Sequence, residues 1–282
     1  NSKEYGTISG AMSVTINGKE MTLQQAAVLL ESTDRQKREE VYRSISERRY
    51  TDREKLDELF NKLISLRHQV AQNADFKNFR DYMFTAMGRF DYVPQDCFDF
   101  HESVQHEVVP VLNLLAEERR DKLGLADLKP WDKAVDPTGE PPLVPFKDAG
   151  DLVEKTISCF NRLDPFLGQC LKTMKEINHL DLESKKGKAP GGYNYPLAEI
   201  GIPFIFMNAT STLRDMVTML HEGGHAVHSV VTKDLELVDF RHTPSEVAEL
   251  ASMSMELISM DQWYLFFPDV KGLAVKKPVL RK

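Results

Sequence analysis

The sequence predicts a mainly α-helical protein with a small amount of β-structure. Apolar residues recur three and four positions apart at about 34–73, 94–123, 148–163 and 166–178, which is the spacing of amphipathic helices. Strand signals are confined to two short regions, near residues 8–21 and at 202–207. A chain of 282 residues, 41% of them hydrophobic, can bury a substantial core.

Composition excludes several classes of partner. The formal net charge is −7, and no basic stripe interleaved with aromatic residues appears, so no nucleic-acid partner is expected. No apolar run is long enough to span a bilayer, and no membrane association is expected. Cys97, Cys159 and Cys170 form no Cys-x-x-Cys pair. They are interpreted as reduced, buried thiols of a cytoplasmic protein.

The N-terminal region predicts a β-hairpin followed by a helix. Asn17-Gly18 is a signal for a type I′ turn, and it lies between the expected strands Ile8–Ile16 and Lys19–Met21. Thr22 and Gln25 have the spacing of a capping box, so a helix is expected to begin directly after the hairpin.

Amphipathic scaffold helices are predicted at 34–73 and 94–123. On the helix at 94–123, His101 and His106 lie beside Glu102 and Glu107. That group could bind a metal at the surface, but solvated helix charges are the preferred interpretation.

Proline and glycine concentrate at 125–145 and interrupt the helical pattern. We therefore predict three parts: a helical lobe with the hairpin at 1–124, a Pro-rich crossing at 125–147, and a catalytic region at 148–282. No internal repeat is visible.

The strongest chemical signal is His221-Glu222-Gly223-Gly224-His225. His-Glu-x-x-His on a helix places two imidazoles on one face, where both can bind a zinc ion, and leaves the glutamate as a general base. Two consecutive glycines disfavour a helix, so they indicate close approach by a substrate or a second helix. His228 lies too far along the axis to join the same ion; a second-shell, substrate-side or packing role stays open.

A third zinc ligand is expected downstream. Thr243 and Glu246 have the spacing of a capping box with Pro244 at the first helical position. Glu246 is then expected to bond the Thr243 amide as part of the capping box. Glu249, one turn further, is left to face the metal. Glu256 lies on the same face seven residues later; a solvated position and a role in supporting the ligands are equally favoured.

Residues 185–209 are expected to meet the substrate. Gly187, Gly191 and Gly192 allow the backbone to come close to a ligand. The short apolar strand Ile202–Met207 directly precedes the zinc helix, so its edge is predicted to pair with an extended peptide. A buried hairpin without substrate contact is the alternative.

These motifs resemble the zinc oligopeptidases typified by thimet oligopeptidase and oligoendopeptidase F, the latter more closely. The resemblance rests on His221 to His225, on Pro-Ser-Glu-Val-Ala-Glu-Leu-Ala-Ser at 244–252, and on the segments 187–193 and 203–208. Ile8-Ser9-Gly10-Ala11-Met12 and Lys129-Pro130-Trp131-Asp132 are also similar; in the family the latter motif looks structural.

The resemblance implies a mainly α, helical zincin-type metallopeptidase with a deep cleft and a small β-sheet beside the zinc helix. It implies one Zn²⁺ per chain, held by His221, His225 and Glu249, with Glu222 activating a zinc-bound water. Short peptides are the implied substrates, and the oligomeric state is open. The predicted substrate-binding residues are Gly191, Gly192, Tyr193, Asn208 and His228.

Departures from the family leave alternatives open. The family's further catalytic histidine and tyrosines lie well beyond the second ligand helix, whereas this chain ends at Lys282. We therefore expect an internal fragment of a longer protein. A zinc-binding but inactive peptide-binding fragment is the main alternative to a zinc endopeptidase. An aminopeptidase is a weaker one, because the Gly-x-Met-Glu-Asn signature is absent.

Overall fold

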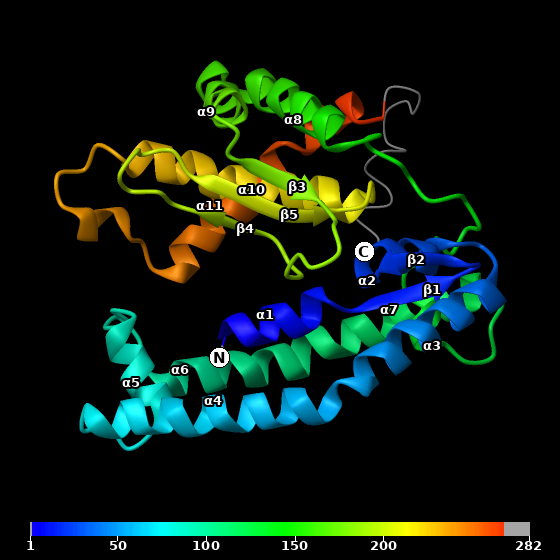
Figure 1. Ribbon diagram of the computed structural model, residues 1–282, viewed down its shortest axis with the longest axis horizontal. Helices are drawn as coiled ribbons and strands as arrows, with labels where there is room; N and C mark the ends of the chain where they lie inside the picture. The colour runs from blue at the N-terminus through cyan, green and yellow to red at the C-terminus, as the bar shows by residue number, and fades with distance from the viewer. Residues whose placement is uncertain (1, 268–282) are drawn as a thin grey trace. The chain divides into compact units, whose positions relative to one another are not determined.

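A computed structural model describes residues 2–267 (Figure 1). It confirms a mainly α-helical fold with two small sheets. The chain divides into two compact units: residues up to 8 with 29–141, and residues 9–28 with those from 142 on. None of the helices described for this part of the chain is both long and apolar enough to cross a membrane.

The first unit contains the predicted scaffold helices. Its helices and short helical turns are α3 (Arg35–Thr51), α4 (Arg53–Asn73), α5 (Phe79–Ala86), α6 (Pro94–Ser103), the π-helical η2 (Val104–Val108), α7 (Val109–Lys122) and η3 (Pro130–Asp132). Two elements, α1 (Ser2–Gly10) and η1 (Val28–Glu31), each have residues in both units.

Two of the predicted long helical stretches are interrupted. The stretch at 34–73 is two helices that meet at Asp52, which accepts a hydrogen bond from Arg48 at 2.5 Å. The stretch at 94–123 changes to π-helix just before Pro110. Proline has no amide hydrogen and clashes with the preceding turn, and a π-helical bulge relieves that conflict.

An ionic cluster around the buried Asp132 joins α3 to η3. Its carboxylate accepts hydrogen bonds from Arg35 at 2.9 and 3.0 Å, from Arg38 at 2.8 Å and from the Lys129 amide at 3.0 Å. Arg38, also buried, donates in addition to the Trp131 carbonyl. Burial alone would raise the pKa of Asp132, but these donors together lower it to about 2.

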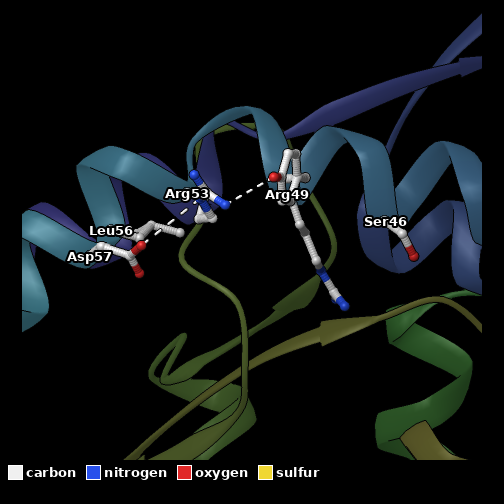
Figure 2. Close-up of a pocket in the computed structure, with 6 residues that line it drawn as sticks. Ser46, Arg49, Arg53, Leu56 and Asp57 are labelled. Atoms are coloured by element: carbon white, nitrogen blue, oxygen red, sulfur yellow. Dashed lines mark hydrogen bonds and ion pairs between the residues drawn. The ribbon is translucent and has the colours of Figure 1, made fainter.

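A shallow pocket of about 360 Å³ lies in the same unit where α3 meets α4 (Figure 2). Arg53 in this pocket donates to the Tyr50 hydroxyl at 2.9 Å and lies 4.0 Å from Asp57. None of the predicted site residues lines it.

The second unit contains the metal motif. Its elements are β1 (Ser13–Ile16), β2 (Lys19–Thr22), α2 (Leu23–Ala27), α8 (Ala149–Leu163), α9 (Pro165–Glu176), β3 (Leu180–Glu183), β4 (Tyr193–Tyr195), β5 (Phe204–Ala209), α10 (Leu213–Thr232), η4 (Val238–Arg241), α11 (Ser245–Ile258) and η5 (Met260–Leu265).

The predicted hairpin forms, but its first strand is shorter than expected. Asn17 and Gly18 both have positive φ, as a type I′ turn requires. The strand does not begin at Ile8, because residues up to Gly10 are helical and β1 begins at Ser13. Ser13 pairs with Thr22, and Thr22 caps α2 with the predicted capping box. The partner strand ends there, so earlier residues have nothing to pair with.

The hairpin belongs to the second unit, and hydrogen bonds join it to residues 184–187 of the same unit. Thr22 Oγ1 lies 3.0 Å from Ser184 Oγ, and the Gly187 amide donates to the Gly10 carbonyl at 2.9 Å. Lys186 pairs with Glu20 on the hairpin. The three-part division predicted from the proline-rich stretch stays a prediction; its placing of the hairpin with the helical lobe differs from these contacts.

The three-stranded sheet has the order β3-β5-β4. β5 pairs with β3 in parallel and with β4 antiparallel. The predicted strand at 202–207 is therefore the central strand, and its edges are not free to bind a peptide. In the described sheet the edge strand nearest the metal motif is β4.

One apolar core packs α10 against the sheet and against α8, α9, α11 and η5 (Figure 1). Its fully buried side chains include Phe160, Leu171, Met174, Ile205, Met207, Met216, Met219 and Leu220. Cys159 and Cys170 are buried in it, as predicted, and burial raises the pKa of the Cys159 thiol to about 12. Cys97 is only partly buried, contrary to the prediction.

Candidate active site

The N-terminus of α10, the helix that carries the motif, is capped by side chains. Thr212 and Asp215 form a capping box. One oxygen of Asp215 also accepts hydrogen bonds from the amide and hydroxyl of Thr210 at 2.8 and 3.1 Å. These bonds set the turn from β5 into α10, so the motif residues two turns later keep a defined position relative to the sheet.

The two glycines of the motif allow close packing. A Cβ atom on Gly224 would lie 2.9 Å from the Cα of Ser252 and 3.0 Å from the Cβ of Met255, both on α11. A Cβ atom on Gly223 would lie 2.9 Å from the ring of Phe160 on α8. Of the two explanations offered for the glycines, close approach by a second helix is confirmed.

That close packing brings His221, His225 and Glu249 together. Glu249 has one carboxylate oxygen 3.3 Å from His221 Nε2 and the other 3.7 Å from His225 Nε2. One possible ligand atom from each residue lies within 4.8 Å of the others. Ligand atoms of a tetrahedral zinc site with bonds near 2.1 Å lie roughly 3.4 Å apart. The donor set therefore fits a zinc ion in type, number and spacing.

Glu256 supports the first histidine. Its carboxylate lies 2.7 Å from His221 Nδ1. When that carboxylate accepts the bond, Nδ1 carries the proton and Nε2 keeps a lone pair for a metal, an arrangement common around ligating histidines. Of the two interpretations left open for Glu256, the geometry favours the supporting one.

Glu249 is oriented from its own helix. The buried Ser252 hydroxyl lies 3.0 Å from the Glu249 carbonyl and 3.3 Å from its side-chain carboxylate. α11 begins at Ser245, with Pro244 rather than Thr243 in the N-cap position and no side-chain cap hydrogen bond. The predicted capping box on Thr243 is therefore wrong: Pro244 keeps an extended ψ of 145° and lies outside the helix.

Glu222 is buried, with 6% of its surface exposed. Burial raises the pKa of Glu222 above its ordinary value, and nearby His221 and a hydrogen bond from the Asn194 amide only partly oppose that shift. Because Asn194 is the middle residue of β4, this bond links the predicted base to the edge strand of the sheet.

The cluster is rich in negative charge. Burial, together with His221, lowers the pKa of His225 and favours its neutral form. Among the ion pairs of residues 2–267, none joins a lysine or arginine to Glu222, Glu249 or Glu256. A cation bound between these side chains would offset the charge.

Asn208 contacts the loop that contains Gly187, Gly191 and Gly192, so its amide nitrogen is already hydrogen-bonded. Its Nδ2 donates to the carbonyls of Ala189 and Gly191 at 2.8 and 2.9 Å. Lys188 is anchored as well, donating to the carbonyls of Asp181 and Glu183. The loop is thus held from both sides, and Gly191 adopts a φ of +104° that favours glycine.

The other predicted substrate residues lie on two elements. Tyr193 is on β4, with its ring stacked on Phe206 at 4.9 Å, and Gly192 lies against the Phe206 carbonyl. His228 is on α10 and lies outside the His221–His225–Glu249 group. It is near enough to contribute to the lowered pKa of His225. Their substrate contacts stay predictions. His101 and His106 belong to no candidate metal group among the described residues.

Sequence reasoning missed Asn194 and Ser252. The alternation Tyr-Asn-Tyr at 193–195 is a short strand signal that could have suggested β4. The bond from its amide to Glu222 depends on two segments meeting in the fold, and no local pattern encodes it.

Comparison with known proteins identifies the family of the chain. Residues 28–140 and 166–278 match Peptidase family M3. The chain belongs to that family. The structure resembles PZ peptidase A, solved with an inhibitor, with a TM-score of 0.90 and 32% identity over 95% of this chain and 48% of that one.

Curated relatives include oligoendopeptidase F of Lactococcus lactis subsp. cremoris, 25% identical over 82% of this chain and 37% of that protein. Group B oligopeptidase PepB of Streptococcus agalactiae is 23% identical over the same shares. The predicted family resemblance is confirmed. The chain spans about half the length of the solved relatives and little more than a third of the curated ones.

Proposed function

We propose that this chain carries the metal centre of a zinc endopeptidase that hydrolyses short oligopeptides. One observation supports it most: two imidazoles and a carboxylate offer donor atoms within 4.8 Å of one another, beside a buried glutamate. His221, His225 and Glu249 would hold one Zn²⁺ per chain. The ion would supply a Lewis acid that polarises the scissile carbonyl.

Glu222 takes the role of general base. It neighbours the first ligand in sequence and is oriented by the Asn194 amide. In this position it accepts a proton from the attacking water and passes it to the leaving amine. Glu256 keeps His221 in the tautomer with a free Nε2.

The substrate backbone is expected to pair with β4. This strand has β5 on one side only, and the Asn194 amide points from its other side to Glu222. A peptide added along that edge would pass directly by the base, in the manner of β-strand addition.

Glu222→Gln provides the test. The variant should keep zinc at the wild-type content but cleave an internally quenched, end-blocked peptide at least a thousandfold more slowly, because its amide cannot accept the proton. Glu176→Gln, an exposed change at the end of α9, is the matched control. Equal zinc content with activity within tenfold of wild type contradicts the assignment. Zinc binding without any cleavage by the wild-type chain favours the inactive fragment.

A further inference from the structure

The two tyrosines of the edge strand lie on the face of the sheet away from the motif helix. Side chains alternate along a strand, and Asn194 points toward α10, where its Nδ2 lies 3.3 Å from Ser229 Oγ. Tyr193 and Tyr195 therefore project from the opposite face. Their surfaces are 48% and 61% exposed.

The ring of Tyr193 packs on a side chain of the neighbouring strand β5. Tyr193 pairs in register with Phe206, and the two rings stack with an interplanar angle of 9°. The Lys188 ammonium lies 4.4 Å from the centre of the Phe206 ring. That lysine is in turn fixed by Asp181, at 3.0 Å. An exposed aromatic ring on such a support can bind a partner without losing much side-chain freedom.

We propose that Tyr193 forms a specificity subsite that selects an aromatic side chain on the bound peptide. This inference rests on the proposed pairing of the substrate with β4. A peptide residue directly opposite Tyr193 would have its side chain on the same face, beside the exposed ring. Aromatic pairs across neighbouring strands are among the more favourable ones, and such a pair is worth up to about fivefold in affinity.

Binding can be measured apart from cleavage. End-blocked, fluorescently labelled heptapeptides carry one phenylalanine, moved stepwise through a background of alanine, glutamine and lysine. Anisotropy titrations in EDTA, where no zinc-dependent turnover occurs, give a Kd for each peptide. The comparison covers wild type, Tyr193→Ala, Tyr193→Phe and the control Tyr264→Ala, which removes an equally exposed tyrosine from η5.

At one position, phenylalanine should tighten binding to wild type about fivefold. The gain should fall below twofold in Tyr193→Ala and stay in Tyr193→Phe and Tyr264→Ala, because the ring and not the hydroxyl makes the contact. A gain that survives in Tyr193→Ala overturns the subsite. The subsite is also overturned if wild type shows no preferred position for phenylalanine. The same holds if arginine, placed in the same peptides instead of phenylalanine, tightens binding equally.

Cleavage of the same peptides with zinc is scored separately. Ring-dependent binding without cleavage contradicts the peptidase proposal and leaves the subsite standing. Cleavage by wild type, with a phenylalanine preference that is unchanged in Tyr193→Ala, supports the peptidase proposal and contradicts the subsite.

Discussion

Two groups of charged side chains, one in each unit, differ in how their charge is balanced. Asp132 is completely buried, and two arginines and a backbone amide donate to it. Glu222, Glu249 and Glu256 surround two histidines, and no lysine or arginine among residues 2–267 pairs with them. The first group is complete as a structural element. In the second group, no lysine or arginine among residues 2–267 balances the carboxylates, an arrangement that a bound cation would stabilise.

The largest effect is expected when Asp132 is removed from its group with Arg35 and Arg38. Asp132→Asn should destabilise the first unit by about 3–5 kcal/mol, because Arg38 is left buried without its counter-charge. Zinc content should not change. The chain has two tryptophans, Trp131 in the first unit and Trp263 in the second, so urea unfolding in a Trp263→Phe background reports on the first unit. Lost zinc with unchanged unfolding would reverse the roles of the two groups.

The second test removes one acid from the group that contains His221 and His225. Glu249→Ala should weaken zinc binding by more than about a hundredfold, since it deletes a ligand rather than an outer partner. Its effect on unfolding in EDTA should be small, because Glu249 is half exposed. Glu246→Ala, one turn earlier on α11, is the control. Metal analysis after dialysis decides; zinc lost from the Glu246 variant and kept in the Glu249 variant would mean the ligand is wrongly assigned.

The substitution Glu256→Gln tests whether Glu256 supports His221 as a zinc ligand. The amide can still contact His221 Nδ1 but carries no charge to strengthen the imidazole as a donor, so zinc affinity should fall by about ten- to a hundredfold. A zinc-competition titration against a chromophoric chelator measures this, with Glu249→Ala as the larger reference effect. Affinity within twofold of wild type would assign Glu256 to a solvated position.

The sequence was informative where one short segment carries the geometry. His221, Glu222 and His225 share one helix, and the type I′ turn at Asn17-Gly18 is encoded by two residues. It was less informative where partners come from distant segments. Asp132 lies 97 residues from Arg35, and nothing local identifies them as a pair.

Element boundaries failed where neighbouring structure overrode a local signal. The strand expected from Ile8 lacks a partner because Thr22 ends β2 and starts α2. Residues 202–207 have the composition of an edge or a central strand equally well. Only the pairing of β5 with both β3 and β4 shows that the edge is at Tyr193–Tyr195.

The last prediction concerns acid. The pKa of Asp132 is about 2 in the folded chain, against an ordinary value of 3.8. A folded-state pKa below the unfolded value means that the carboxylate stabilises the fold above about pH 4. That contribution, about 2 kcal/mol, is lost as the pH falls toward 2. Urea unfolding in EDTA, followed by Trp131 fluorescence with Trp263 replaced by Phe, should show it as a difference between wild type and Asp132→Asn. The difference should be constant from pH 7 to 5 and shrink below pH 4, because only the wild type then gains a proton on unfolding. A gap that stays constant down to pH 3 would show that Asp132 titrates normally and that the arginines do not hold its charge.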